Sequence, residues 1–583
     1  MSFDLTDERK AYIEATGKVV LNACPGSGKT TTIAHKLLKL TNEWEQQYGN
    51  SGGIACLSFT NVAKNEIAEK YRTITGFPLA YPHSISTIDS FINGYITLPF
   101  VHKIMDVGKR WRIVDDYAYI DRLFENNWQF IKKYKNLCYA FRPSKVDFTI
   151  TDGISWDGKD KSADADFVIY GRAVKTIQYN AGLLKTSDSA VFALKILKKI
   201  PRVATYLSER YPYLIIDEAQ DTSEIQHALL QALIDNGLKH VDLVGDPYQC
   251  LYQWRDANPE LFLKKFDDTI NWQGLRLTEN RRSTQNIVDV FSPLRRPGEQ
   301  PVTCPQCHTS DQTLHILKYP AGGQRHIVST FEELCKSNQL KNNRILVRGN
   351  TMRNELLGRQ SEYKPWGEAL PYLLVEAKIH LESNEVKDAV RKVRRIIISL
   401  LNPGLTYQEV KDKEDDSKDS HHLNGTIFTM VRNLPDFALP VKDWTLQTQA
   451  YLKTSLQITT EIDFGIRKKT SKTFDTATLA QPLNTFFKKA VTSNELPVTT
   501  IHQAKGMTFE AILFILSENR QGQNIGFDDF IPPTAMPSEK QRLVYVAISR
   551  PQRLLCIGMP DSIGDQELKI RFGDNITILP TLT

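Results

Sequence analysis

The segment that most constrains the fold is LNACPGSGKTTTIAHKLLKL at residues 21–40. The apolar run at 19–21 predicts the end of a buried strand, and Ile33, Leu37 and Leu40 lie at helical spacing after it. A glycine-bearing loop between a strand and a helix directs free N–H groups and the positive helix end to one point. An unliganded helix cap is the alternative, but the two flanking elements favour a bound phosphate.

The loop also carries the side chains that a nucleotide site needs. Lys29 can reach the β and γ phosphates as a point charge, and the Thr30 hydroxyl can ligate magnesium. The pattern G-x-x-x-x-G-K-[ST] is met except that Ala23 replaces its first glycine. The residues predicted to surround the nucleotide here are Ala23, Cys24, Pro25, Gly26, Ser27, Gly28, Lys29, Thr30 and Thr31.

A second segment, YLIIDEAQD at 213–221, predicts an apolar strand that ends in two carboxylates, Asp217 and Glu218. Asp217 can hold magnesium through its water shell, and Glu218 can accept a proton from an attacking water. Two solvated acids at a strand end would be the alternative. Beside the phosphate loop, the pair favours nucleotide hydrolysis over nucleotide storage.

Composition sets the outer limits. A chain of 583 residues predicts about three to five domains, and no stretch reaches the roughly 18 apolar residues of a membrane span. The first ten residues, MSFDLTDERK, lack a signal sequence, and eight scattered cysteines suit reduced thiols, so we expect a cytoplasmic protein with no membrane partner. The net charge of +6 is too small by itself to indicate a polyanion partner.

Six further segments resemble motifs of the UvrD/Rep/PcrA-like helicases of superfamily one, and they occur in the order of that family. Together with the phosphate loop and the acid pair they carry a likeness that covers most of the chain outside two regions. The segments are IACLSFTNVAKNEIAEKY (54–71), ISTIDSFI (85–92), VGDPYQCLYQWRDA (244–257), LTENRRSTQNI (277–287), VTTIHQAKGMTFEAILF (498–514) and EKQRLVYVAISRPQRLL (539–555).

The resemblance implies an α/β protein with two RecA-like P-loop NTPase lobes, each with an inserted, mostly helical subdomain. It also implies ATP and Mg²⁺ as cofactors, in a cleft between the lobes. The boundaries predicted for the first lobe are 1–94 and 206–275 with an insertion at 95–205, and those for the second lobe are 276–359 and 491–583 with an insertion at 360–490.

By resemblance, Arg282 and Arg550 reach the γ phosphate from the other lobe, and Gln249 links the γ-phosphate state to DNA. The reaction itself favours such groups, because planar guanidinium donors match the charge on a transferred phosphoryl group. A surface ion pair is the alternative for either arginine. With Lys29, Asp217 and Glu218, they complete the predicted catalytic set, in which Thr30 and Asp217 are the metal ligands.

The resemblance also marks a track for single-stranded DNA. Aromatic side chains can stack on any base, which gives a grip that tolerates sequence. A place in the buried core is the alternative for Phe59, whereas the polar neighbours of Trp254 favour DNA. The residues predicted to contact DNA are Phe59, Asn61, Thr87, Tyr252, Trp254 and His502.

Three departures from the family pattern fall where the base and sugar are expected. Arg9 stands in place of a glutamine that reads adenine, Arg281 in place of a tyrosine that stacks on it, and Thr508 in place of a glutamate near the ribose. We still assign Arg9, Arg281 and Gly506 to the nucleotide. Because an arginine supplies donors only, adenine selectivity is not predicted. Asp89, where many relatives have histidine, is a further difference of unknown effect.

The predicted insertions contain less specific signals. Residues 147–171 alternate like strands around a polar turn, and 187–200 are helical, so the first insertion is mixed. In the second, 387–402 predict an amphipathic helix whose basic face is more simply solvated than bound to DNA. Residues 411–422 predict a loop or a disordered segment.

The segment TCPQCHTSDQ at 303–312 contains a C-x-x-C-H pattern. Haem attachment is improbable in a cytoplasmic chain, and zinc binding by Cys304 and Cys307 would need a second paired spacing that the nearby residues lack. A reduced hairpin tip is the default interpretation.

These features predict a DNA-dependent ATPase and helicase that moves along single-stranded DNA, 3′ to 5′ by resemblance, as in DNA repair. Single-stranded or tailed DNA would be its partner. The alternative is a regulatory ATPase that senses nucleotides or DNA ends and gates a partner nuclease, similar in kind to the helicase-like subunit of the Gabija antiviral system. The altered base pocket favours the second hypothesis, and the complete DNA track favours the first.

Overall fold

The structure is a computed structural model, and its chain divides into two compact units, Met1–Leu346 with Ile501–Thr583, and Val347–Thr500. Each unit is described by itself. The residues that the structure describes are 4–49, 52–115, 117–125, 127–149, 153–251, 257–305, 314–320, 323–356, 365–382, 386–403, 405, 407–417, 420–459, 461–466, 479–487, 498–516 and 524–579.

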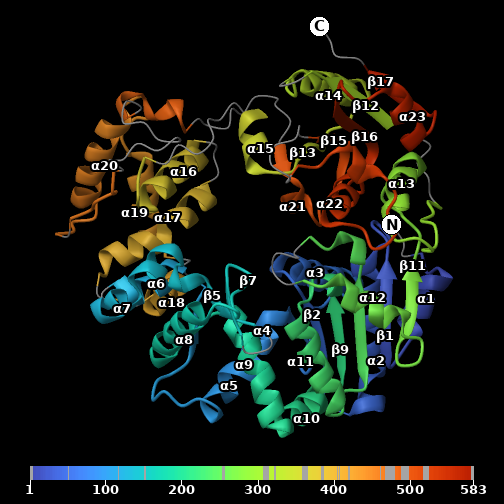
Figure 1. The fold of residues 1–583 in the computed structure, drawn as a ribbon, viewed down its shortest axis with the longest axis horizontal. Helices are drawn as coiled ribbons and strands as arrows, with labels where there is room; N and C mark the ends of the chain where they lie inside the picture. Colours follow the sequence, from blue (N-terminus) through green and yellow to red (C-terminus); the bar gives the residue numbers. More distant parts are fainter. Residues whose placement is uncertain are drawn as a thin grey trace. The chain divides into compact units, whose positions relative to one another are not determined.

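The first unit contains a six-stranded sheet in the order β11-β1-β10-β9-β2-β3 (Figure 1). Every neighbouring pair in it is parallel. Its central strands are buried on both faces, which explains why they read as unbroken apolar runs. The strands are β1 (Lys18–Ala23), β2 (Ile54–Ser58), β3 (Ser84–Thr87), β9 (Tyr213–Asp217), β10 (His240–Gly245) and β11 (Gln273–Leu277).

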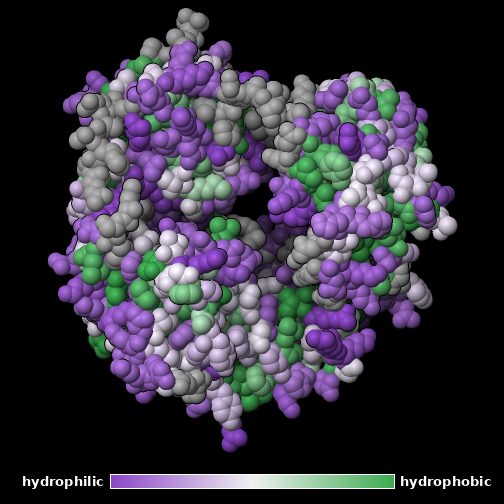
Figure 2. Space-filling model, turned by 180° about the vertical axis from the view of Figure 1, so that it is seen from behind, coloured by the Kyte–Doolittle hydropathy of each residue, from purple (hydrophilic) through white to green (hydrophobic). Residues whose placement is uncertain are grey.

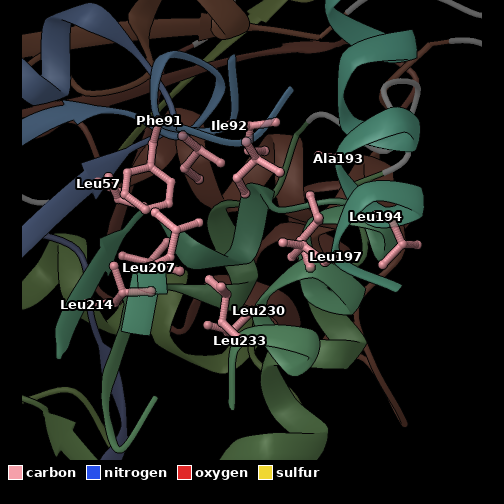
Figure 3. Packing of buried hydrophobic residues seen from close by; sticks show 14 of the residues in the cluster. Leu57, Phe91, Ile92, Ala193, Leu194, Leu197, Leu207, Leu214, Leu230 and Leu233 are labelled. Atoms are coloured by element: carbon pink, nitrogen blue, oxygen red, sulfur yellow. The ribbon is translucent and has the colours of Figure 1, made fainter. Parts of the chain in front are cut away.

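Helices cover both faces of this sheet, because successive side chains of a strand point to opposite faces. Val19 and Leu21 pack with α1 (Asp7–Glu14), α2 (Lys29–Tyr48) and α3 (Asn61–Thr75). Val20 and Leu57 pack in the cluster of the other face, part of which Figure 3 shows. That face is covered by α9 (Thr186–Lys199), α10 (Pro201–Arg210), α11 (Glu224–Asp235) and α12 (Pro259–Asp267).

A second six-stranded sheet has the order β14-β13-β15-β16-β12-β17. The pairs β13/β15, β15/β16, β16/β12 and β12/β17 are parallel. Two parallel six-stranded sheets confirm the predicted α/β class with two RecA-like lobes. The elements are β12 (Leu314–Tyr319), β13 (Asn343–Val347), β14 (Val498–Thr500), β15 (Phe509–Ile515), β16 (Pro551–Pro560), β17 (Ile576–Leu579), α13 (Gln285–Phe291), α14 (His326–Ser337), α21 (Ile501–Ala504), α22 (Glu539–Ile548) and α23 (Asp565–Phe572).

Between β3 and β9 the chain forms a mixed region. Its strands are β4 (Arg112–Ile113), β5 (Val146–Phe148), β6 (Ile154–Trp156), β7 (Lys159–Asp160) and β8 (Leu183–Leu184), and its helices are α4 (Ile88–Ile92), α5 (Leu98–Phe100), α6 (Tyr117–Glu125), α7 (Trp128–Ala140) and α8 (Ala165–Asn180). The β-like prediction for 147–171 is wrong beyond Asp160. Asp164 caps α8 by accepting from the Phe167 N–H, and Phe167, Tyr170 and Val174 are buried at helical spacing.

The second unit is largely helical, around a core that includes Trp366, Trp444 and Val393. Its helices are α15 (Asn350–Leu356), α16 (Leu370–Glu382), α17 (Val386–Leu401), α18 (Tyr407–Asp416), α19 (His421–Arg432) and α20 (Val441–Ser455). The loop predicted for 411–422 is wrong, because α18 continues to Asp416 and α19 begins at His421. The charges that suggested a loop include Glu414, which pairs with Arg395 at 2.6 Å.

The helix predicted at 387–402 is α17, and three of its basic side chains pair with acids inside this unit. Arg391 pairs with Asp388 and Lys392 with Glu376, at 2.6 Å each. This arrangement agrees with the solvated face favoured for this helix. The six predicted domain boundaries are not tested and stay predictions.

The C-x-x-C-H segment is described only up to Pro305. The Cys304 thiol donates to the Ser283 carbonyl, and Cys307 lies outside the described residues. The described part of the chain contains no group of three or more His, Cys, Asp or Glu side chains placed to hold a metal ion. None of the described helices combines the length and hydrophobicity that crossing a bilayer requires. Figure 2 shows a face on which hydrophilic residues predominate.

Candidate nucleotide site

The phosphate loop joins β1 to α2, and two glycines shape it. Gly26 and Gly28 have φ of 72° and 81°, in the left-handed region that favours glycine. A Cβ on Gly26 would lie 2.6 Å from the Arg282 Cβ, so only glycine allows the segment after β11 to approach so closely. The loop then leads into α2, whose first N–H groups have no partner within the helix.

The carboxyl end of β9 lies beside this loop, because β1, β10 and β9 are parallel neighbours. Lys29 Nζ lies 3.0 Å from Glu218 Oε1. Burial would raise the pKa of Glu218, but the cations of Lys29 and Lys505 lower it to about 2. Burial, together with the neighbouring Glu218, raises the pKa of Asp217 to about 7. The pKa values of the two adjacent acids are therefore shifted in opposite directions. The backbone of Glu218 is also strained, with a φ of 55°.

A buried polar chain connects the two sheets at this point. Asp246 follows β10, and its Oδ2 accepts from Gln249 Nε2 at 2.7 Å and from the Tyr545 hydroxyl at 3.2 Å. The Gln249 Oε1 accepts in turn from Arg550 Nη2 at 2.6 Å. Burial, with the nearby charge of Arg282, lowers the pKa of Arg550 to about 9. Lys29, Asp217, Glu218, Gln249 and Arg550 are called the carboxylate flank below.

The segment after β11 closes over the loop. The Asn280 Nδ2 donates to the Pro25 carbonyl at 2.7 Å, and the Arg281 N–H donates to the Gly26 carbonyl at 3.0 Å. Arg282 Nη1 donates to the Ser549 carbonyl at 3.2 Å, which links this segment to the end of α22. The structure therefore brings Arg282 against the phosphate loop and next to Arg550.

Charged residues on the opposite side of the loop pair with one another. Arg9 donates to the carbonyls of Ser27 at 2.8 Å and Asp4 at 2.7 Å. The two carboxylate oxygens of Glu8 accept from the Thr278 N–H and hydroxyl, both at 2.7 Å. Arg281 Nη2 contacts Asp4 Oδ2 and Glu279 Oε2, both at 2.7 Å. This arginine flank consists of Asp4, Glu8, Arg9, Glu279 and Arg281.

Sequence reasoning missed two charged residues of the site, Lys505 and Asp221, whose side chains pair at 2.5 Å. Both lie inside segments that resemble family motifs, but their pairing joins residues far apart in sequence. It brings the segment after α21 to the Asp217–Asp221 turn. Gly506 follows with a φ of 83° and open space around a Cβ at its position, and its assignment to the nucleotide stays a prediction.

The predicted DNA residues that the structure describes are Phe59, Asn61, Thr87 and His502. Phe59 is half-buried just after β2, and Asn61 is exposed at the first position of α3. Thr87 ends β3 and caps α4 by accepting from the Ser90 N–H at 3.1 Å. Because β2 and β3 are parallel to β1, these three residues lie at the carboxyl ends of the strands, the same end of the sheet as the phosphate loop. His502 is half-buried in α21, and Tyr252 and Trp254 lie outside the described residues.

Comparisons with known proteins agree with this geometry. The UvrD/REP helicase N-terminal domain matches residues 5–270, and the UvrD-like helicase C-terminal domain matches residues 429–561. ATP-dependent DNA helicase Rep of Buchnera aphidicola is 28% identical over 50% of this chain and 45% of its own length. ATP-dependent DNA helicase PcrA of Staphylococcus aureus is 21% identical over 70% of this chain and 55% of its own length.

A probable DNA helicase II homolog of Mycoplasma capricolum is 25% identical over 49% of this chain and 40% of its own length. The chain thus spans about half the length of these relatives. A phosphate loop shared with an unrelated protein would not explain matches to both domains of one family, in the order expected of that family. The two parallel sheets agree with those two matches. The chain belongs to the UvrD/REP family of helicases.

Proposed function

We propose that this chain hydrolyses ATP between its two sheets and uses that reaction to move along single-stranded DNA. The observation that carries the proposal is the buried chain Asp246–Gln249–Arg550, which joins the end of β10 to the end of α22 beside the Lys29–Glu218 pair. A transferred phosphoryl group needs cations and planar donors around it. Lys29, Arg282 and Arg550 converge on the phosphate loop from three segments and meet that need.

The Lys29–Glu218 pair suits a site that changes when nucleotide arrives. Phosphate oxygens would compete with Glu218 for the Lys29 ammonium. Once Lys29 turns to phosphate, Glu218 loses the cation that lowers its pKa most and becomes a stronger base for the attacking water. The same exchange places a carboxylate where the proton of that water must go.

The residues at the end of β9 fit a magnesium ion. The Asp217 Oδ1 is buried and has no hydrogen-bond partner among the described residues, and Thr30 stands at the second position of α2. A hard cation prefers such oxygen ligands and would offset the cost of ionising a carboxylate whose pKa is raised. When bound, magnesium would neutralise charge on the β and γ phosphates, with Thr30 and Asp217 holding it.

The link to DNA rests on where the predicted track lies. Phe59, Asn61 and Thr87 follow strands of the same sheet as the phosphate loop, so movement of one sheet against the other would shift track and nucleotide together. Single-stranded or tailed DNA is the proposed partner, and 3′ to 5′ movement is the proposed polarity. Rep and PcrA, both described as ATP-dependent DNA helicases, support the assignment.

A second candidate function is a nucleotide-gated subunit that regulates a partner nuclease in antiviral defence and unwinds little DNA itself. One observation favours it. Three basic side chains of α17, those of Arg391, Lys392 and Arg395, pair with acids of their own unit, which reduces the charge that this helix offers to a duplex. A DNA repair role would accompany the first function, and a defence role the second.

Steady-state hydrolysis of ATP by the purified chain, with and without single-stranded DNA, tests the proposal together with strand separation on 3′-tailed and 5′-tailed duplexes. Stimulated hydrolysis with separation of the 3′-tailed duplex would support the motor. Hydrolysis without separation would favour the gated subunit, and separation of only the 5′-tailed duplex would contradict the polarity.

Two variants assign the site within that experiment. Lys29→Ala should lower turnover at least about a hundredfold, because a positioned cation is lost from the transferred phosphate. Lys39→Ala, on the same helix but partly exposed, is the matched control and should leave turnover unchanged. Trp254→Ala should weaken DNA stimulation and spare basal hydrolysis, since a stacked base contributes about 1 to 3 kcal/mol. Retained activity in Lys29→Ala would exclude the assigned site.

A further inference from the structure

The arginine flank lies where the base of a bound nucleotide is expected. The carboxylate flank marks the γ-phosphate end of the loop, because it holds the acids and the arginine suited to hydrolysis. A nucleotide extended along the loop would then direct its sugar and base toward the other side, where Arg9 and Arg281 lie. The chemistry of those residues therefore bears on which nucleotide the site accepts.

Selecting one base requires polar groups that are free to match its edge. A site that hydrogen-bonds a substrate group rejects analogues that lack it by about 10⁴-fold or more, whereas a site without such groups discriminates about 10 to 200-fold. Adenine presents an acceptor beside a donor, and guanine presents two acceptors, on the edge that carries N7. To distinguish adenine from guanine, the site needs at least one hydrogen-bond donor or acceptor that is held in a fixed place and is not already paired within the protein.

The described groups of this flank already have partners. Arg9 is only 6% exposed and donates to two main-chain carbonyls, of which Ser27 belongs to the phosphate loop. Both oxygens of Glu8 accept from Thr278. Asp4 and Glu279 share the Arg281 guanidinium. These side chains pair with one another and with the loop, so few of their hydrogen-bonding groups remain available to contact a base.

One donor in this flank is an exception. The Arg281 Nε is buried and has no hydrogen-bond partner among the described residues. A single N–H finds an acceptor on every base, so this donor could hold a nucleotide and still not distinguish adenine from guanine, cytosine or uracil.

We infer that this flank supports the phosphate loop without reading the base, so that the site hydrolyses ribonucleoside triphosphates with little regard to base. Arg9 is then a positioning residue that acts through the Ser27 carbonyl. The inference rests on the proposed function, because it assumes that the site hydrolyses nucleotides. It deepens that function by naming the substrate class as ribonucleoside triphosphates of any base.

The experiment measures kcat/KM for ATP, GTP, CTP and UTP with the full chain, magnesium and single-stranded DNA. We expect the four values to agree within about tenfold, as for a pocket that makes no specific hydrogen bond to the base. A preference for ATP of more than about 200-fold over the other three would overturn the inference and leave the proposed function intact. No hydrolysis of any of the four would instead refute the proposed function.

Variants of Arg9 separate loop support from base reading. Arg9→Ala should raise KM about tenfold for all four nucleotides, because a charged hydrogen bond to the loop is lost, and the ratios between nucleotides should stay unchanged. A change of more than threefold in any ratio would show that Arg9 reads the base and would contradict the inference. Lys10→Ala, exposed one position along α1, is the matched control. If Arg9→Ala does not fold, the wild-type panel and Arg281→Ala, judged by the same ratios, decide the question.

Discussion

The two flanks of the phosphate loop are both densely charged, yet they are built differently. In the arginine flank the charges pair with one another and with main-chain groups of the loop. The carboxylate flank instead contains a buried Asp217 oxygen without a partner among the described residues, a Glu218 in left-handed backbone and two adjacent acids with divergent pKa values. Groups that change partners during a reaction are left strained or unsatisfied, whereas groups that hold a geometry are satisfied, here with the Arg281 Nε as the exception.

The largest expected effect comes from the arginine at the centre of the link between sheets. Arg550→Lys should lower kcat about a thousandfold with little change in KM, because lysine keeps the charge but cannot hold Gln249 and the phosphoryl group with a planar fork. The ratios among nucleotides should not move. Stopped-flow or coupled-assay kinetics with the four nucleotides measure both quantities.

Arg553→Lys, an exposed position on β16, is the matched control and should behave as wild type. The comparison between flanks would fail if Arg550→Lys altered nucleotide preference, since the carboxylate flank would then also shape the base site.

A buried ion pair beneath both flanks gives the next effect, on stability. Lys36 of α2 pairs with Asp242 of β10 at 2.7 Å with both side chains fully buried, and the ammonium lies 4.2 Å from the Tyr12 ring of α1. Lys36→Met should lower the free energy of unfolding by about 3 to 5 kcal/mol, because it leaves Asp242 buried and unpaired. Denaturant unfolding followed by circular dichroism measures the loss.

The double variant Lys36→Met with Asp242→Asn tests the cause of that loss. It should recover most of the stability, because no uncompensated charge remains and the asparagine oxygen can still accept from the Tyr213 hydroxyl, as Asp242 does at 3.1 Å. Since the pair supports elements of both flanks, neither variant should alter the ratios among nucleotides. A double variant as unstable as the single one would indicate that packing of the lysine stem, not charge, is what Lys36 contributes.

The difference between the flanks also separates what sequence could predict from what it could not. Local patterns correctly predicted the strand before the phosphate loop, the helix after it and the strand that ends at Asp217, because each depends on a few adjacent residues. The pairings Arg9–Ser27, Glu8–Thr278 and Lys505–Asp221 join segments distant in sequence, so no periodicity or motif indicated them. The helix α18 was missed for the same reason. Its many charged residues are typical of a loop, and only the structure shows that Arg395, distant in sequence, pairs with Glu414.

The smallest effect concerns the unsatisfied acid of the carboxylate flank. Because burial and Glu218 raise the folded pKa of Asp217 to about 7, above that of an ordinary aspartate, its ionisation opposes folding. Stability that is present at low pH is therefore lost as the pH rises toward 7. Asp217→Asn removes that ionisable group and its repulsion of Glu218, so it should stabilise the metal-free chain by about 1 to 2 kcal/mol at pH 8 and by less at pH 5.5.

Thermal unfolding in a chelating buffer at the two pH values measures this difference, with the exposed Asp235→Asn as the control expected to change little at either. The same variant should lose magnesium-dependent hydrolysis. A gain in stability together with a loss of activity is expected when a functional residue is replaced, and not when a structural residue is replaced. An equal gain in stability at both pH values would mean that the charge of Asp217 does not cause the destabilisation. A loss at both would place Asp217 among the satisfied residues and remove the contrast between the two flanks.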